Sequence, residues 1–254
     1  TDGSADYLKT IKDSRVRIVR QENSGLTFTL NRMLREAETP WLVRHDADDI
    51  AYPNRIKLII DYIRKYPAAG MFYSLANYYQ DKKSFGKFRT TIGSPSLLTN
   101  LTKAGYLLAV CHPTVTLNIE KTLAVGGYRF NLYVEDADLW WRMALHSDIV
   151  LIPEFTVGVR HNLSSICGEN LEANSINTLY IQYLLISHLW RLSPLPYDEI
   201  KDKLEATLDK RRLMFRENIR RANIHAGRRE YIKACAYAAK SFIGWKDDHL
   251  ASRF

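Results

Sequence analysis

The stretch WLVRHDADDIAYPNR, from Trp41 to Arg55, decides how the chain is interpreted. Its first three residues, Trp41–Val43, form a short apolar run that soon gives way to carboxylates at Asp46, Asp48 and Asp49. A run of this kind predicts a strand, and acids that follow a strand lie at its C-terminal end, where α/β sheets bind ligands. Carboxylates spaced Asp-x-Asp can hold one hard cation and leave coordination positions open for phosphate oxygens.

A second interpretation of these acids stays open at this point. They could form a polar turn that opens the next helix, with Asp49 near the N-cap and Pro53 in the first turn. Acidic turns are common, so this stretch by itself does not separate a ligand site from a turn. The rest of the chain has to decide.

Composition limits the classes of protein to consider. With 254 residues, 46% of them hydrophobic, the chain can bury a substantial core. No apolar run reaches transmembrane length, the opening residues are polar, and three cysteines are typical of a reduced, cytoplasmic protein. The net charge of +8 favours an acidic partner: nucleic acid, anionic lipid or a phosphate-bearing substrate. The sequence contains no nucleic-acid-binding motif, so we expect no nucleic-acid partner.

The order of patterns predicts an α/β fold. Strands are expected at residues 15–20, 41–43, 70–79 and 110–118 and as two short runs around Pro153, and helices at 5–14, 26–38, 53–66, 120–125 and 133–147. Alternation of strand and helix predicts a mixed, mainly parallel sheet flanked by helices. The basic region from Gln80 to Tyr106 is expected to be a mobile loop followed by a short helix from Ser96.

Beyond about residue 170 the patterns indicate helices only, at residues 176–190, 197–218 and 229–243, with arginines concentrated between Arg211 and Arg229. We therefore divide the chain into an α/β domain, residues 1–168, and a C-terminal helical extension, residues 169–254. The extension either packs onto the domain as a helical hairpin or makes peripheral contact with an anionic membrane, at the inner face of the cell membrane.

Five segments of the chain carry recognisable motifs: TDGSAD, RIVRQENSGLTFTLNRML, VRHDADDIAYPNR, HPTVTLNIEKTLAVGGYRFNLYVEDADLWWRM and VGVRHNLSSIC. In this order they resemble family 2 glycosyltransferases of the GT-A fold. The likeness runs from Thr1 to about Cys167. The family's first strand, the following helix and most of its second strand have no counterpart, so we expect a GT-A-like (Rossmann-like) domain that lacks the usual N-terminal strand.

The resemblance implies roles for individual residues. Asp136 of the Glu-Asp motif would be the general base, and Glu135 would orient sugar hydroxyls or the neighbouring loop. The donor-binding residues would be Asp2, Asn23, Gly25, Arg44 and Asp46. The metal ligands would be Asp46, Asp48 and His161, with Mn²⁺ or Mg²⁺ as the cofactor because both prefer oxygen ligands.

The resemblance also implies a reaction. It is the metal-dependent, inverting transfer of a sugar from a nucleotide-sugar donor, a UDP-sugar, to a hydroxyl of a saccharide or glycolipid acceptor in surface polysaccharide or glycolipid synthesis. One alternative is a catalytically inactive nucleotide-sugar-binding or scaffold protein. Another is a nucleotidyltransferase, which also uses carboxylates and metal but leaves the Glu-Asp helix without a role.

Overall fold

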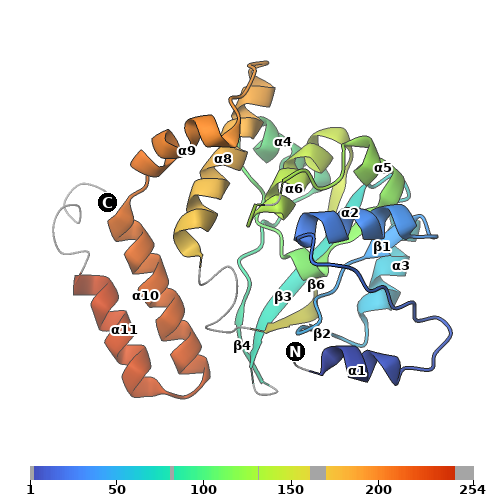
Figure 1. Cartoon of the computed structure of the whole chain (residues 1–254), viewed down its shortest axis with the longest axis horizontal. Coiled ribbons are helices and arrows are strands. Elements are labelled where there is room, and N and C mark those ends of the chain that lie inside the picture. The colour runs from blue at the N-terminus through green and yellow to red at the C-terminus, as the bar shows by residue number, and fades with distance from the viewer. Residues whose placement is uncertain (1–2, 81–82, 131, 161–169, 244–254) are drawn as a thin grey trace.

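The structure is a computed structural model, and it describes residues 3–80, 83–130, 132–160 and 170–243 (Figure 1). The elements are α1 (Ser4–Lys9), α2 (Leu26–Glu36), β1 (Trp41–Val43), β2 (Ile50–Ala51), α3 (Arg55–Lys65), β3 (Met71–Gln80), β4 (Lys83–Lys87), α4 (Pro95–Lys103), a 3-10 turn (His112–Thr114), β5 (Thr116–Asn118), α5 (Ile119–Ala124), α6 (Glu135–His146), β6 (Ile149–Arg160), α8 (Leu171–Leu189), α9 (Tyr197–Ala206), α10 (Lys210–Gly227) and α11 (Tyr231–Ile243).

One mixed sheet organises the first 160 residues. Its strand order is β1-β5-β3-β6-β2, with β4 paired to β3. Helices cover the sheet, as Figure 1 shows for α3 beside β1 and for α2 and α6 above the central strands. The predicted fold class, a mixed α/β sheet flanked by helices with helices at the C-terminus, is confirmed.

The expectation that the sheet would be mainly parallel is wrong for the described strands. Only the pairing of β3 with β6 is parallel, and β1–β5, β3–β5, β2–β6 and β3–β4 are antiparallel. β1, β3 and β6 do point the same way, as helical crossovers between successive strands require. The alternation of strand and helix did not reveal that β5 inserts between β1 and β3 in the opposite direction.

The two faces of the sheet follow the alternation of side chains along β3. Met71 and Tyr73 join the core beneath α2, α4 and α6, whereas Phe72 joins Ile59 of α3 on the other face. In β6, Ile149 and Val150 divide in the same way. Successive strand residues point to opposite faces, so both faces of a sheet covered by helices must be apolar.

Local capping explains where several helices begin. The Ser94 hydroxyl accepts a hydrogen bond from the Leu97 amide at the start of α4, and Pro95 occupies the first helical position. The Asn118 side chain caps α5 through the Lys121 amide at 3.0 Å. The short helix expected from Ser96 is confirmed as α4.

Two local expectations are wrong. The run Arg15–Arg20 forms no strand, and Val16, Ile18 and Val19 lie exposed. Among the described residues no strand lies beside it, and a strand without a partner leaves its backbone groups to water. Part of the expected loop after Gln80 is instead the strand β4, which pairs with β3 as a hairpin.

The C-terminal helices are packed in two groups. α8 and α9 share a core with Trp141 of α6, built around Tyr180, Ile181 and Leu185. α10 and α11 form a helical hairpin with each other, and in Figure 1 this hairpin lies to the left of β4, on the side away from the rest of the sheet. None of the described helices combines the length and the apolar character needed to cross a membrane. The division of the chain at residues 168 and 169 stays a prediction.

Candidate active site

The acids of the opening stretch lie on a turn between two strands. The Arg44 amide donates to the Val115 carbonyl at 2.9 Å and so extends the pairing of β1 with β5 by one residue. The turn at residues 46–49 follows, and β2 then pairs with β6. α3 begins only at Arg55. The acids therefore do not cap the following helix, and the interpretation as a helix-opening turn is wrong.

The three acids of this turn differ in their surroundings. Asp48 is exposed, and Asp46 is half-buried beside Arg44, whose Nη1 lies 2.6 Å from the Asp46 Oδ1. Asp49 accepts a hydrogen bond from the Arg160 amide at 2.9 Å through Oδ1, whereas its buried Oδ2 has no hydrogen-bond partner among the described residues. Burial, together with the charges of the two neighbouring aspartates, raises the pKa of Asp49 to about 6.

This turn fits a hard cation only in part. Asp46 and Asp48 offer carboxylate oxygens, which Mn²⁺ and Mg²⁺ prefer. Within the described residues, no three histidine, cysteine, aspartate or glutamate side chains come together as a metal-binding group. Two carboxylates suffice for a cation that takes its remaining ligands from substrate phosphates and water, the usual arrangement for Mg²⁺. His161, the third expected ligand, lies outside the described residues.

A second pair of acids begins α6. The Glu135 side chain is buried, and the Asp136 Oδ1 accepts a hydrogen bond from the Ala137 amide at 2.7 Å. Burial raises the pKa of both carboxyl groups, and for Glu135 the neighbouring Asp136 adds to the effect. A first-turn carboxylate is favoured as an anion by the helix dipole, but here desolvation outweighs the dipole.

His112 lies beside Glu135 and contacts Tyr128. The His112 Nε2 lies 2.8 Å from the Tyr128 hydroxyl, and its Nδ1 lies 3.6 Å from Glu135 Oε1. Burial and the nearby charge of Arg44 hold the pKa of His112 well below its usual range, so the ring facing Glu135 is neutral. The structure thus places His112 directly beside Glu135.

Arg44 interacts with both groups of acids. Its side chain is only 7% exposed, yet it contacts Asp46 and acts electrostatically on both Glu135 and Asp136. Burial opposes its charge and is the largest single effect, but the hydrogen bond and charge of Asp46, together with the nearby Tyr128 and Glu135, outweigh it and raise the pKa of Arg44. A guanidinium that stays charged therefore links the exposed acids to the buried ones.

Arg55 was not among the predicted site residues. Its Nη2 donates to the carbonyls of Arg44 at 2.5 Å and Pro113 at 2.6 Å, and its Nη1 lies 2.9 Å from His45 Nδ1. It thereby ties the segment before the acidic turn to the 3-10 turn that carries His112. A signal was present in the sequence, because the helix dipole disfavours a cation in the first turn of a helix unless it has another role.

A buried ion network behind α6 was also missed. The fully buried Asp138 carboxylate forms ion pairs with Arg129 and Arg142, each at 2.6 Å. Arg142 also donates hydrogen bonds to the carbonyls of Val125 and Gly127. These bonds hold residues 125–129 against the helix. The spacing of Asp138 and Arg142 on one helix predicts their contact. The burial of Asp138 depends on residues far away in the sequence, which the spacing does not reveal.

Two of the remaining predicted donor-binding residues, Asn23 and Gly25, lie just before α2. Asn23 is exposed, and its side chain accepts a hydrogen bond from the Gly25 amide at 3.2 Å just before α2. Gly25 has a φ of 86°, a conformation that favours glycine. The next turns of α2 touch the segment that precedes α6, since Asn31 bonds the Tyr128 backbone. Asp2 lies outside the described residues.

With this geometry in view, comparisons with known proteins are informative. The family model "Glycosyl transferase family 2" matches residues 1–123. The N-terminal half of the chain belongs to glycosyltransferase family 2. The amylovoran biosynthesis glycosyltransferase AmsE of Erwinia amylovora is 24% identical over 141 residues, 55% of this chain and 52% of its own. The chain thus spans about half the length of this curated relative.

Two solved structures match at lower identity. The mannosyltransferase PcManGT of Pyrobaculum calidifontis, solved with GDP-Man and Mn²⁺, is 14% identical, with a TM-score of 0.47 over 98% of this chain and 64% of its own. TarS of S. aureus is 12% identical, with a TM-score of 0.49 over 94% of this chain and 48% of its own. TM-scores below 0.5 add no argument, so the family assignment depends on the sequence match.

Proposed function

We propose that this chain is a metal-dependent, inverting glycosyltransferase. It would move a sugar from a nucleotide-sugar donor, a UDP-sugar, to a hydroxyl of a saccharide or glycolipid acceptor in the synthesis of a surface polysaccharide or glycolipid. One observation carries the proposal: buried Arg44 contacts Asp46 of the acidic turn and acts electrostatically on Glu135 and Asp136 at the start of α6. Glycosyl transfer needs both groups, one for the leaving diphosphate and one for the proton of the attacking hydroxyl.

The acidic turn would serve the donor. Asp48 and Asp46 would hold Mn²⁺ or Mg²⁺, which when bound supplies Lewis-acid neutralisation of the diphosphate. Because Arg44 touches Asp46, its guanidinium would also lie near the developing negative charge. Asn23 and Gly25, just before α2, would contact the nucleotide.

The buried pair would serve the acceptor. Asp136 would take the proton from the acceptor hydroxyl as the oxygen bonds to the anomeric carbon. Its raised pKa suits this role, because a general base works best with a pKa near the working pH. Glu135, held beside neutral His112, would orient sugar hydroxyls. A base on the face opposite the leaving group implies inversion.

The surroundings of the enzyme are part of the proposal. A cytoplasmic protein with basic C-terminal helices would reach a glycolipid acceptor through peripheral contact with the inner face of the cell membrane. No nucleic-acid partner is proposed.

A screen of nucleotide sugars tests the function. Purified protein is heated with each nucleotide sugar, with Mn²⁺ and with EDTA, because a donor that binds only the folded chain raises the melting temperature. We expect one class of nucleotide sugar to stabilise the protein in Mn²⁺ and to be hydrolysed slowly. Metal-dependent stabilisation without hydrolysis or transfer would instead favour an inactive nucleotide-sugar-binding protein, and no stabilisation by any donor would contradict both.

A further inference from the structure

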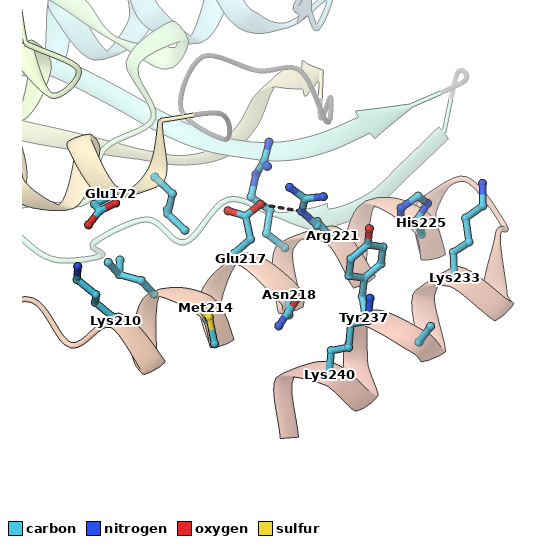
Figure 2. A pocket seen from close by; sticks show the side chains of 14 residues that line it. Glu172, Lys210, Met214, Glu217, Asn218, Arg221, His225, Lys233, Tyr237 and Lys240 are labelled. Carbon is cyan, nitrogen blue, oxygen red and sulfur yellow. Dashed lines mark hydrogen bonds and ion pairs between the residues drawn. The ribbon is translucent and has the colours of Figure 1, made fainter. Parts of the chain in front are cut away.

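A groove of about 1190 Å³ lies between α10 and α11 and reaches the first turn of α8 (Figure 2). One face of α10 lines it at spacings of three and four residues, and α11 contributes a shorter stripe opposite. These lining residues are Lys210, Met214, Asn218, Arg221 and His225 from α10, and Lys233, Tyr237 and Lys240 from α11. The groove lies outside the candidate active site, and the proposed transfer reaction does not use it.

Cations outnumber acids among the residues that line the groove. Lys210, Arg220, Arg221, Lys233 and Lys240 line it, against the acids Glu172 and Glu217. The Arg221 Nε lies 2.7 Å from Glu217, so one of these acids is already paired inside the groove. The positive charge also gathers at one ring, since the Arg221 guanidinium lies 5.7 Å and the Lys240 ammonium 5.2 Å from the centre of Tyr237. A surface of this kind attracts an anionic partner.

Apolar side chains are exposed in the groove and at the nearby start of α11. Met214 lies in the groove and is 58% exposed. Ile232, at the start of α11 beside Lys233, is 89% exposed, and Tyr231 before it is also exposed. A soluble polyanion would contact only the cations and would leave the exposed apolar side chains without a partner. An anionic phospholipid matches both features, because it carries a phosphate and an apolar glycerol and acyl region.

The hairpin is fixed to the protein by its other side. Ala222 and Ile224 of α10 are buried. At the end of α10, Gly227 lies against Phe85 of β4, where a Cβ would come within 3.2 Å of the ring. The groove and the exposed start of α11 therefore belong to a helix pair that packs against the rest of the protein.

We propose that this groove, together with Tyr231 and Ile232, docks the protein on an anionic membrane. Headgroup phosphates would lie between α10 and α11, and Ile232 would enter the interfacial region. The proposal deepens the proposed function, since it names the surface that would bring the enzyme to a membrane-held acceptor. Binding to vesicles is nevertheless measured without any transfer reaction, so either proposal can fail alone.

Co-sedimentation with vesicles tests the docking surface. We expect the full chain to bind phosphatidylcholine vesicles that contain phosphatidylglycerol, to bind less as salt rises, and not to bind pure phosphatidylcholine. The double variant Lys233→Glu/Lys240→Glu should lower the partition coefficient at least about fivefold. Ile232→Glu should also lower it, and because this side chain is almost fully exposed the variant should fold as the wild type does.

Matched controls locate the effect. Lys201→Glu/Lys203→Glu in α9 makes the same charge change, and Leu192→Glu the same apolar-to-acidic change, at exposed sites outside the groove. Controls that bind as the wild type does support the proposal. Equal binding to neutral vesicles, no binding to anionic ones, or an equal loss in the controls would overturn it. Binding to a soluble polyanion such as heparin without vesicle binding would assign the groove to another partner and equally overturn it.

Discussion

The two groups of acids in this protein carry the same chemical group in opposite surroundings. Asp46 and Asp48, on the turn after β1, have exposed or half-exposed carboxylates. Glu135 and Asp136, at the start of α6, are buried enough that desolvation raises the pKa of both. The contrast teaches that exposure leaves oxygens available to a hydrated cation, whereas burial tunes a carboxylate to exchange a proton. Arg44 contacts the first group and acts electrostatically on the second.

The largest effect that would test this contrast is expected from Asp136→Asn. The amide keeps the size of the side chain but cannot accept the proton, so transfer to the acceptor should fall about 10²–10⁴-fold. Donor affinity should stay near wild type, because the proposed donor site lies on the other acids. Steady-state transfer and nucleotide binding by calorimetry measure the two quantities. Retained transfer would remove Asp136 as the base, and a loss of donor binding would make it a binding residue.

The pH dependence of the wild type sharpens the same test. A base acts only when deprotonated, so transfer should decline as pH falls through the pKa of the buried pair. Because burial raises that pKa, the decline should begin at a higher pH than for an ordinary carboxylate. Any residual transfer by Asp136→Asn should lack this acidic limb.

The exposed acids should respond in binding rather than in proton transfer. Asp48→Ala removes a proposed metal ligand, so affinity for a nucleoside diphosphate in Mn²⁺ should fall at least about 100-fold, more than the loss of an outer-shell partner. Affinity measured in EDTA should stay unchanged. Asp61→Ala, an exposed aspartate of α3, is the matched control. Unchanged, metal-dependent binding by Asp48→Ala would place the cation elsewhere.

A third variant tests how the two groups are held together. Arg55→Met keeps much of the side-chain volume but loses the bonds to the carbonyls of Arg44 and Pro113. Leaving these buried acceptors without a donor should cost about 2–4 kcal/mol of unfolding free energy, measured by urea titration. Arg64→Met in the last turn of α3 is the control, since an exposed arginine there should cost little. A loss equal to the control's would show that Arg55 does not join the two segments.

The sequence predicted the acids of the site better than the residues that hold those acids in place. Asp46 and Asp48 follow an apolar run in a recognisable spacing, and Glu135 and Asp136 begin a periodic helix, so local patterns identify both groups. The contact between Arg55 and Pro113 joins positions 58 residues apart. No local pattern carries that information.

The same limit explains the errors in the fold. The alternation of strand and helix gave the direction of β1, β3 and β6 but not the place of β5, which depends on how a three-residue strand fits between two others. The run at Arg15–Arg20 has strand-like alternation, but a strand needs a neighbour, and periodicity does not report one. The roles of Asp2 and His161 stay predictions.

The smallest effect is expected from Asp49, which lies on the exposed turn but is half-buried like the α6 pair. Its pKa, about 6, is above the value expected for an unfolded chain, so the folded protein binds this proton more tightly. The carboxyl therefore contributes stability at low pH that is lost as pH rises through about 6. Asp49→Asn is neutral at every pH, and its Oδ1 can still accept a hydrogen bond from the Arg160 amide.

In EDTA the Asp49→Asn variant should be more stable than wild type above about pH 6, by about 1 kcal/mol after allowance for solvent screening, or about 2–4 °C in Tm. The advantage should disappear below about pH 4. A variant less stable than wild type at pH 7 would show that the ionised carboxylate is stabilised by its surroundings, and the acidic turn would then contain no group that resembles the buried pair.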